Sequence, residues 1–136
     1  MWLAYLTGLR RGDLLRLSRF QVRPDGLASK EGKTGKRVLI DWTPELRRVV
    51  QEALDASPDD RLFPLTESAV NNAWGRLQRA WAAAGHERFQ LKDPRAKHAT
   101  DFEAAGGDAT AQLGHSGRAV AARHYLRAPR RVIPIR

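Results

Sequence analysis

The sequence predicts an α+β fold that is mainly helical, with a small three-stranded antiparallel sheet near the N-terminal end. Short apolar segments between residues 19 and 41 are separated by glycine-containing turns, which is typical of hairpins. Two longer segments after residue 43 repeat their apolar side chains with the period of a helix. The chain has 136 residues, 42% of them apolar, which suits one compact domain and is too short for two.

The N-terminal segment predicts two short helices. Residues 1–6, MWLAYL, read as the end of an apolar helix, which Thr7 and Gly8 interrupt. The leucines of residues 12–17 then indicate a second short helix. No N-cap residue precedes the first helix, so we expect the chain to begin inside it.

The three predicted strands cover residues 19–23, 27–31 and 36–41. Between the first two, the sequence PDG at 24–26 predicts a turn, because proline presets φ and glycine accepts a positive φ. Between the last two, the glycines of GKTG at 32–35 fit a tight reversal.

Two amphipathic helices follow. Thr43 is a good N-cap for the first and Pro44 suits its first position, and SPDD ends it. Thr66 or Ser68 caps the second, and Gly85 closes it. Both keep a helical apolar period, so we expect their apolar side chains, tryptophans included, to lie in the core. These side chains are Leu46, Val49, Val50, Ala53 and Leu54 in the first helix, and Val70, Ala73, Trp74, Leu77, Trp81 and Ala84 in the second.

The C-terminal third predicts three more helices, at about residues 94–106, 109–113 and 116–125. Residues 128–136 form a basic tail with two prolines, which we do not expect to continue a helix.

The charge of the chain indicates an anionic partner. Lysine and arginine number 24 against 15 aspartate and glutamate, a net charge of +9. Nucleic acid is the first candidate and an anionic membrane the second, while solubility alone remains an alternative. The chain has no cysteine, and its four histidines lack a zinc-like spacing, so we expect no metal and no cofactor.

Three cation-rich segments stand out. The first is TGLRRGDLLRL at residues 7–17, with Arg10 in the turn between two helices, and the second is KTGK, with Lys33 at a hairpin tip. The third runs from LKDPRAKH through LGHS to RHY and carries Lys92, Arg95, His115 and Tyr125. Each segment alone is better explained by solvated charges or by a half-buried packing tyrosine than by a catalytic role.

In this order, the segments closely resemble the catalytic domain of tyrosine recombinases, the phage-integrase family, over residues 3–127. The resemblance implies a site-specific recombinase or integrase that cuts and rejoins double-stranded DNA through a 3′-phosphotyrosyl intermediate. It further implies a homo-multimer, a tetramer on DNA, in the cytoplasm as a bacterial or phage-encoded protein. Residues 1–136 would be a single catalytic domain truncated at its N-terminus, without the family's preceding DNA-binding domain.

The resemblance also assigns roles to single residues. Arg10 and Arg95 would clamp the non-bridging oxygens of the scissile phosphate, and Tyr125 would be the nucleophile. Lys33 would protonate the leaving 5′-oxygen. His115 would hydrogen-bond the phosphate or aid proton transfer.

Two further positions complete the comparison. Asp13 matches an acidic position that supports the first arginine. Lys92 stands where the family usually has histidine, and Pro94 where it prefers leucine. Lysine still binds phosphate but is a poorer base, since its reference pKa is about 10.4 against about 6.5 for histidine. Lys97 and His98 are expected to contact the DNA backbone or to lie on the surface.

The chemistry is consistent with these roles. Two guanidiniums each offer parallel N–H donors to an anion, which lysine cannot copy. A phenol with a pKa of about 10 needs nearby cations and a proton acceptor to attack near neutral pH, and the leaving alkoxide needs a general acid. A covalent phosphotyrosine retains the bond energy for rejoining.

Two alternatives remain open. In the first, the chain is a catalytically inactive or truncated recombinase remnant that only binds DNA through its basic surface. In the second, it binds RNA or an anionic membrane. The absence of a basic amphipathic helix with exposed aromatics and of an RNA-binding aromatic motif disfavours the last.

Overall fold

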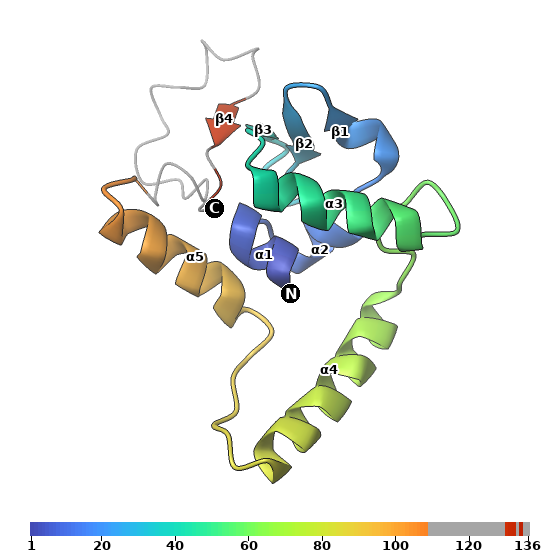
Figure 1. The fold of residues 1–136 in the computed structure, drawn as a ribbon, viewed down its shortest axis with the longest axis vertical. Helices are drawn as coiled ribbons and strands as arrows, with labels where there is room; N and C mark the ends of the chain where they lie inside the picture. The colour runs from blue at the N-terminus through green and yellow to red at the C-terminus, as the bar shows by residue number, and fades with distance from the viewer. Residues whose placement is uncertain (109–129, 133, 135–136) are drawn as a thin grey trace.

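The computed structural model describes residues 1–108, 130–132 and 134. It confirms the mainly helical α+β fold with a small antiparallel sheet (Figure 1). The helices are α1 Trp2–Thr7, α2 Arg11–Leu15, α3 Pro44–Ala56, α4 Glu67–Ala83 and α5 Asp93–Ala104. The strands are β1 Val22–Arg23, β2 Gly26–Lys30, β3 Arg37–Ile40 and β4 Arg130–Val132.

The break between the first two helices is built as the sequence predicts. Gly8 ends α1 in the left-handed conformation, with φ of 66°, which a glycine adopts without the penalty of a Cβ. Arg10 follows in an extended conformation, and its carbonyl accepts hydrogen bonds from Asp13 N and Leu14 N to begin α2. The turn therefore places Arg10 between the two helices.

The sheet has the strand order β1-β2-β3-β4. The antiparallel pairs β1–β2 and β2–β3 are the predicted hairpins. The sequence did not predict β4, which lies in the basic tail and runs parallel to β3, with Ile40 opposite Val132. Asp41 N extends this pairing by donating to Val132 O at 2.8 Å. The tail thus covers an edge of β3 that would otherwise present unpaired backbone groups.

The first predicted strand, residues 19–23, is shorter than expected. Only Val22–Arg23 pairs as β1, whereas Arg19–Gln21 form a turn of 3-10 helix. Ser18 and Gln21 explain the difference, because their side chains form a capping box: Ser18 N donates to Gln21 Oε1 at 2.8 Å. This local side-chain bonding competes with extension of the strand.

The predicted caps of the long helices are confirmed. Thr43 Oγ1 accepts a hydrogen bond from Leu46 N at 3.2 Å at the start of α3. Thr66 Oγ1 accepts one from Ala69 N at 3.1 Å at the start of α4, so Thr66 rather than Ser68 is the cap.

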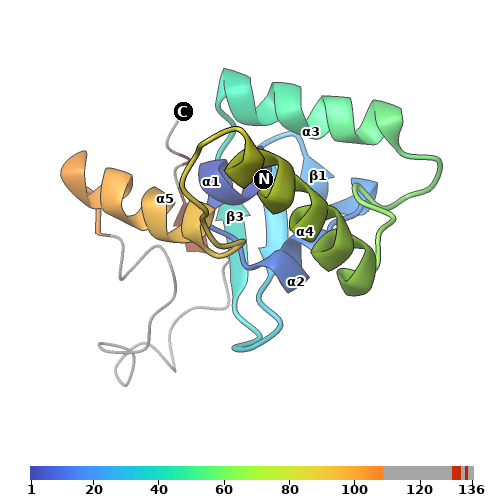
Figure 2. The ribbon, with the colours of Figure 1, turned by 90° about the horizontal axis from the view of Figure 1, so that it is seen from below.

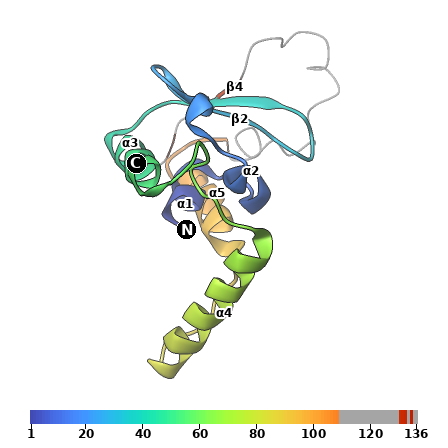
Figure 3. The ribbon, with the colours of Figure 1, turned by 90° about the vertical axis from the view of Figure 1, so that its right-hand side faces the viewer.

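The hydrophobic core lies between the sheet and the helices α1 and α3. Helix α1 packs against both α5 and α3, and Figure 2 shows it between them. In Figure 3 these three helices lie on the same side of the sheet. The most completely buried apolar side chains are Leu6, Leu17, Leu27, Ile40, Leu46 and Leu62.

Helix α4 extends away from this core (Figures 1 and 3). The prediction that its whole apolar stripe is core is wrong, because Leu77 is 46% and Trp81 39% exposed. Trp74 and Trp81 instead make edge contacts with Phe89, at ring-centroid distances of 5.0 and 6.1 Å, and Trp81 stacks on His86. The segment that returns toward α5 thus covers part of this face.

The predicted helices over residues 109–113 and 116–125 lie outside the described residues. Within the described part of the chain, no helix combines the length and apolar character needed to cross a membrane.

Candidate phosphate-binding site

Arg10 and Glu31 connect the helical turn to the hairpin between β2 and β3. Arg10 Nη1 lies 3.2 Å from Glu31 Oε2. The arginine side chain is 29% exposed, whereas that of the glutamate is 6% exposed. A buried carboxylate is costly unless it is paired, so this contact holds Arg10 against Glu31, while part of the arginine side chain stays exposed.

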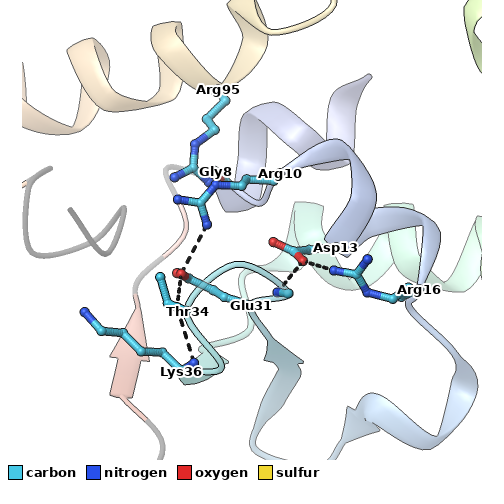
Figure 4. Close-up of polar contacts among 9 residues, drawn as sticks. Gly8, Arg10, Asp13, Arg16, Glu31, Thr34, Lys36 and Arg95 are labelled. Atoms are coloured by element: carbon cyan, nitrogen blue, oxygen red, sulfur yellow. Dashed lines mark hydrogen bonds and ion pairs between the residues drawn. The ribbon is translucent and has the colours of Figure 1, made fainter. Parts of the chain in front are cut away.

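Arg95 reaches the same place from the first turn of α5. Its Nη1 donates to the carbonyl oxygen of Gly8, at the end of α1. Figure 4 shows the guanidinium groups of Arg95 and Arg10 next to each other. The packing of α1 against α5 therefore brings together two arginines that lie far apart in the sequence.

The pKa of Arg95 reflects the charges of Arg10, Glu31 and Asp13 around it. Burial lowers the pKa of the Arg95 guanidinium from its usual value, and Arg10 lowers it further. Glu31 and Asp13 act in the opposite direction on this pKa. Arginine remains protonated in proteins, so the two like charges stay adjacent and favour an anion between them.

Asp13 lies beneath this group and anchors the hairpin. Its Oδ1 accepts a hydrogen bond from Gly32 N at 2.9 Å and pairs with Arg16 (Figure 4). Only 3% of the Asp13 side chain is exposed. A Cβ on Gly32 would stand 2.2 Å from Arg16 Nη2, so a larger residue at this position would displace the exposed end of the Arg16 side chain. Asp13, the predicted support for Arg10, thus lies near Arg10, but its Oδ1 contacts the hairpin and Arg16 rather than Arg10.

The two candidate lysines lie on exposed segments at the edge of the site. Lys33 is in the turn between β2 and β3, as predicted. Lys92 is the residue before α5, and it lines the same cleft as Arg10 and Arg95.

This cleft has a volume of about 900 Å³ and runs between α2, α4 and the start of α5. Its walls are mostly apolar, formed in part by Leu9, Leu14, Val70 and Trp74. Apolar walls do not suit a polyanion. The part of the cleft that could bind an anion is therefore its cationic edge, formed by Arg10 and Arg95, and not its apolar walls.

His98 corrects one expectation. Instead of lying on the surface, it is fully buried, and its Nδ1 lies 2.6 Å from Tyr5 O. A carbonyl oxygen only accepts, so Nδ1 carries the proton. Burial lowers the pKa of His98, and Arg95 lowers it as well. Lys97 is exposed as expected, and its Nζ lies 3.0 Å from Asp101 Oδ1.

His115 and Tyr125 lie outside the described residues. Of the other predicted site residues, the structure brings Arg10, Arg95 and Asp13 together. The sequence reasoning missed Glu31 and its neighbour Thr34, although a glutamate directly before a glycine turn in a mostly apolar sheet is a detectable signal. Among the described residues, no three histidine, aspartate or glutamate side chains gather in a way that could hold a metal ion.

Comparison with solved structures identifies the fold. The lambda integrase catalytic core has 21% sequence identity and a TM-score of 0.65, over 83% of this chain and 79% of that one. A lambda integrase tetramer bound to a Holliday junction has 20% identity and a TM-score of 0.68, over 88% of this chain and 39% of that one. The Tn1549 transposon integrase in complex with circular intermediate DNA has 16% identity and a TM-score of 0.64, over 93% of this chain and 52% of that one.

The chain therefore has the fold of a tyrosine-recombinase catalytic domain, as the sequence predicts. It spans most of the isolated lambda core and about half or less of the two longer integrase chains. No protein-family model matches the sequence, and no curated protein matches it.

Proposed function

We propose that this chain is the catalytic domain of a site-specific DNA recombinase or integrase. The observation that carries the proposal is the convergence of Arg10 and Arg95 at one cationic edge, within a fold shared with integrases. Two adjacent guanidiniums match the two non-bridging oxygens of a phosphodiester. Each such donor contributes on the order of 3 to 4 kcal/mol to transition-state stabilisation in comparable sites.

In the proposed reaction, the Tyr125 phenolate oxygen attacks the scissile phosphorus. The new bond joins phosphorus to the tyrosine, and the bond from phosphorus to the 5′-oxygen breaks. Lys33 gives its proton to that oxygen, His115 binds the phosphate or accepts the phenol proton, and Lys92 binds the phosphate. The reverse reaction, with a different 5′-hydroxyl, rejoins the strand and releases the tyrosine.

The partner in this proposal is double-stranded DNA, bound by several copies of the chain acting together in the cytoplasm of a bacterial or phage-infected cell. The net charge of +9 supports binding to a polyanion. Two integrases of similar fold are seen bound to DNA, which supports DNA as the partner, and one of them is a tetramer, which supports action as a multimer.

The second candidate is a remnant that binds DNA without cutting it. The lysine at position 92 favours this candidate, because the family that the sequence resembles usually has histidine there and lysine is in general a poorer base than histidine.

One experiment separates the two candidates. The protein is incubated with a pool of end-labelled DNA duplexes of randomised sequence, each with a nick that lets the cleaved fragment diffuse away. Covalent adducts are then resolved on a denaturing gel. The enzyme forms an adduct that Tyr125→Phe abolishes, while this variant still shifts DNA on a native gel. Shifted DNA without any adduct from the unaltered protein would establish the remnant, and an adduct from Tyr125→Phe would exclude this tyrosine as the nucleophile.

A further inference from the structure

Glu31 joins two parts of the site that lie on different elements. Its Oε2 atom accepts a hydrogen bond from Arg10 Nη1 at 3.2 Å and another from Thr34 Oγ1 at 2.7 Å (Figure 4). Thr34 directly follows Lys33 in the hairpin turn. One buried oxygen therefore contacts both the arginine of the helical turn and the tip that carries the candidate acid.

The hairpin is closed around the same residue. Glu31 N donates to Lys36 O at 2.9 Å, and Gly35 N donates to Glu31 O at 2.8 Å. These two bonds close the hairpin turn between Glu31 and Lys36. Among the contacts of the described residues, the Arg10–Glu31 pair and the bond from Gly32 N to Asp13 Oδ1 restrain the movement of this turn relative to the helices.

Building on the proposed function, we infer that Glu31 is a positioning residue that ties Lys33 to the phosphate clamp. The leaving oxygen is bonded to the same phosphorus as the oxygens held by Arg10. A general acid must lie within hydrogen-bond reach of that oxygen. A tip attached to Arg10 keeps its register with the bound phosphate, whereas a loose tip presents Lys33 correctly for only part of the time.

The opposite role, in which Glu31 occupies Arg10 and competes with the phosphate, fits the geometry less well. The contact uses Nη1, and a guanidinium has five N–H donors, so Arg10 can hold Glu31 and an anion together. If Glu31 only occupied Arg10, its second hydrogen bond, from Thr34, would not be needed, because that bond holds the hairpin and not the arginine.

The first test does not depend on DNA cleavage. Amide hydrogen exchange at Gly35 and Lys36 is measured by NMR in the unaltered protein, in Glu31→Ala and in the milder Glu31→Gln. We expect roughly tenfold faster exchange at the tip in Glu31→Ala and a smaller change in Glu31→Gln. Glu52→Ala removes an exposed arginine–glutamate pair on α3 and serves as the matched control. Exchange at the tip that is the same in all four proteins overturns the inference.

The second test asks whether the tie serves the leaving group. A duplex recovered as an adduct from the randomised pool is synthesised with oxygen or with sulfur at the 5′-bridging position. A thiolate leaves without a proton, because the pKa of a thiol is about 8.5 and far below that of an alcohol. With oxygen at this position, Glu31→Ala and Lys33→Ala should each form the adduct at least about tenfold more slowly than the unaltered protein. With sulfur, both variants should form it at nearly the rate of the unaltered protein.

The outcomes are distinct. Equal loss on both substrates in Glu31→Ala places its effect on phosphate binding and overturns the inference, as does faster cleavage with tighter DNA binding. If the unaltered protein forms no adduct with any duplex, the proposed function fails, and the exchange measurement alone decides whether Glu31 holds the hairpin tip.

Discussion

The buried histidine of α5 gives the folded protein a defined sensitivity to acid. His98 is fully buried, and its Nδ1–H satisfies the carbonyl of Tyr5 near the end of α1. Leu9 N, which would bond that carbonyl if the helix continued, donates to Thr7 Oγ1 instead. The histidine is thus part of the contact that holds α5 against α1.

The sign of the effect follows from the pKa shift. Burial lowers the folded-state pKa of His98 below its usual value of about 6.5, and it outweighs the hydrogen bond to Tyr5 O, which raises this pKa; the charge of Arg95 lowers it further. Between the two pKa values the unfolded chain binds more protons than the folded one, so stability falls as the pH falls. The limiting slope is about 1.4 kcal/mol of unfolding free energy per pH unit, beginning near pH 6.5 and ending at the folded-state pKa.

His98→Phe tests this reasoning. The phenylalanine keeps an aromatic ring near Phe102 but leaves the Tyr5 carbonyl without its donor, at a cost of about 1–3 kcal/mol near pH 7.5. As the pH is lowered, the two proteins should approach each other in free energy of unfolding, because only the unaltered protein loses stability as His98 is protonated on unfolding. Urea unfolding followed by tryptophan fluorescence at several pH values measures both curves. A difference that stays constant between about pH 7.5 and 5.5 would refute the assignment of the pH dependence to His98.

Three further predictions test the site, the hairpin and the core. Arg95→Lys removes the planar fork, and single-turnover adduct formation should slow by about 100-fold or more, so a rate near that of the unaltered protein contradicts the phosphate clamp. Gly35→Ala should lower the unfolding free energy by about 1–2 kcal/mol in urea titrations, because Gly35 has φ of 69° and the added Cβ meets no atom within 4 Å, which leaves backbone strain as the cause. Leu46→Ala, at a fully buried position, should cost about 2–5 kcal/mol in the same assay, whereas Leu65→Ala, at a half-exposed one, should change it little; equal losses would contradict the assigned core.

Local signals in the sequence predicted local structure well. Thr43 and Thr66 cap helices because a threonine oxygen satisfies a backbone N–H that has no partner within the helix. Gly8 ends α1 because it accepts a positive φ. The missed strand β4 differs, since Arg130–Val132 gain their pairing from β3, almost a hundred residues earlier, and nothing local marks them as a strand.

The apolar stripe of α4 shows the limit of periodicity. A helical repeat tells which face of a helix is apolar but not what covers that face. Trp81 keeps the period, yet it is 39% exposed and packs against the segment that follows its own helix. Burial is a property of the tertiary partner, which the local pattern does not contain.

The site depends even more on tertiary packing. Arg10 follows α1 and Arg95 lies in the first turn of α5, so their proximity depends on how these two helices meet. That contact involves His98, Tyr5 and the Gly8 carbonyl. None of these contacts has a sequence signature, and the pairing of the two arginines was predicted only through resemblance to a family. Glu31 has no counterpart in that resemblance, and its contacts with Arg10 and Thr34 depend on how the hairpin meets the helical turn. A carboxylate beside two arginines reduces the positive charge available to the phosphate that they are proposed to bind. Its bonds to Arg10 and Thr34 offset the cost of its burial, and the same two bonds tie the hairpin tip to Arg10.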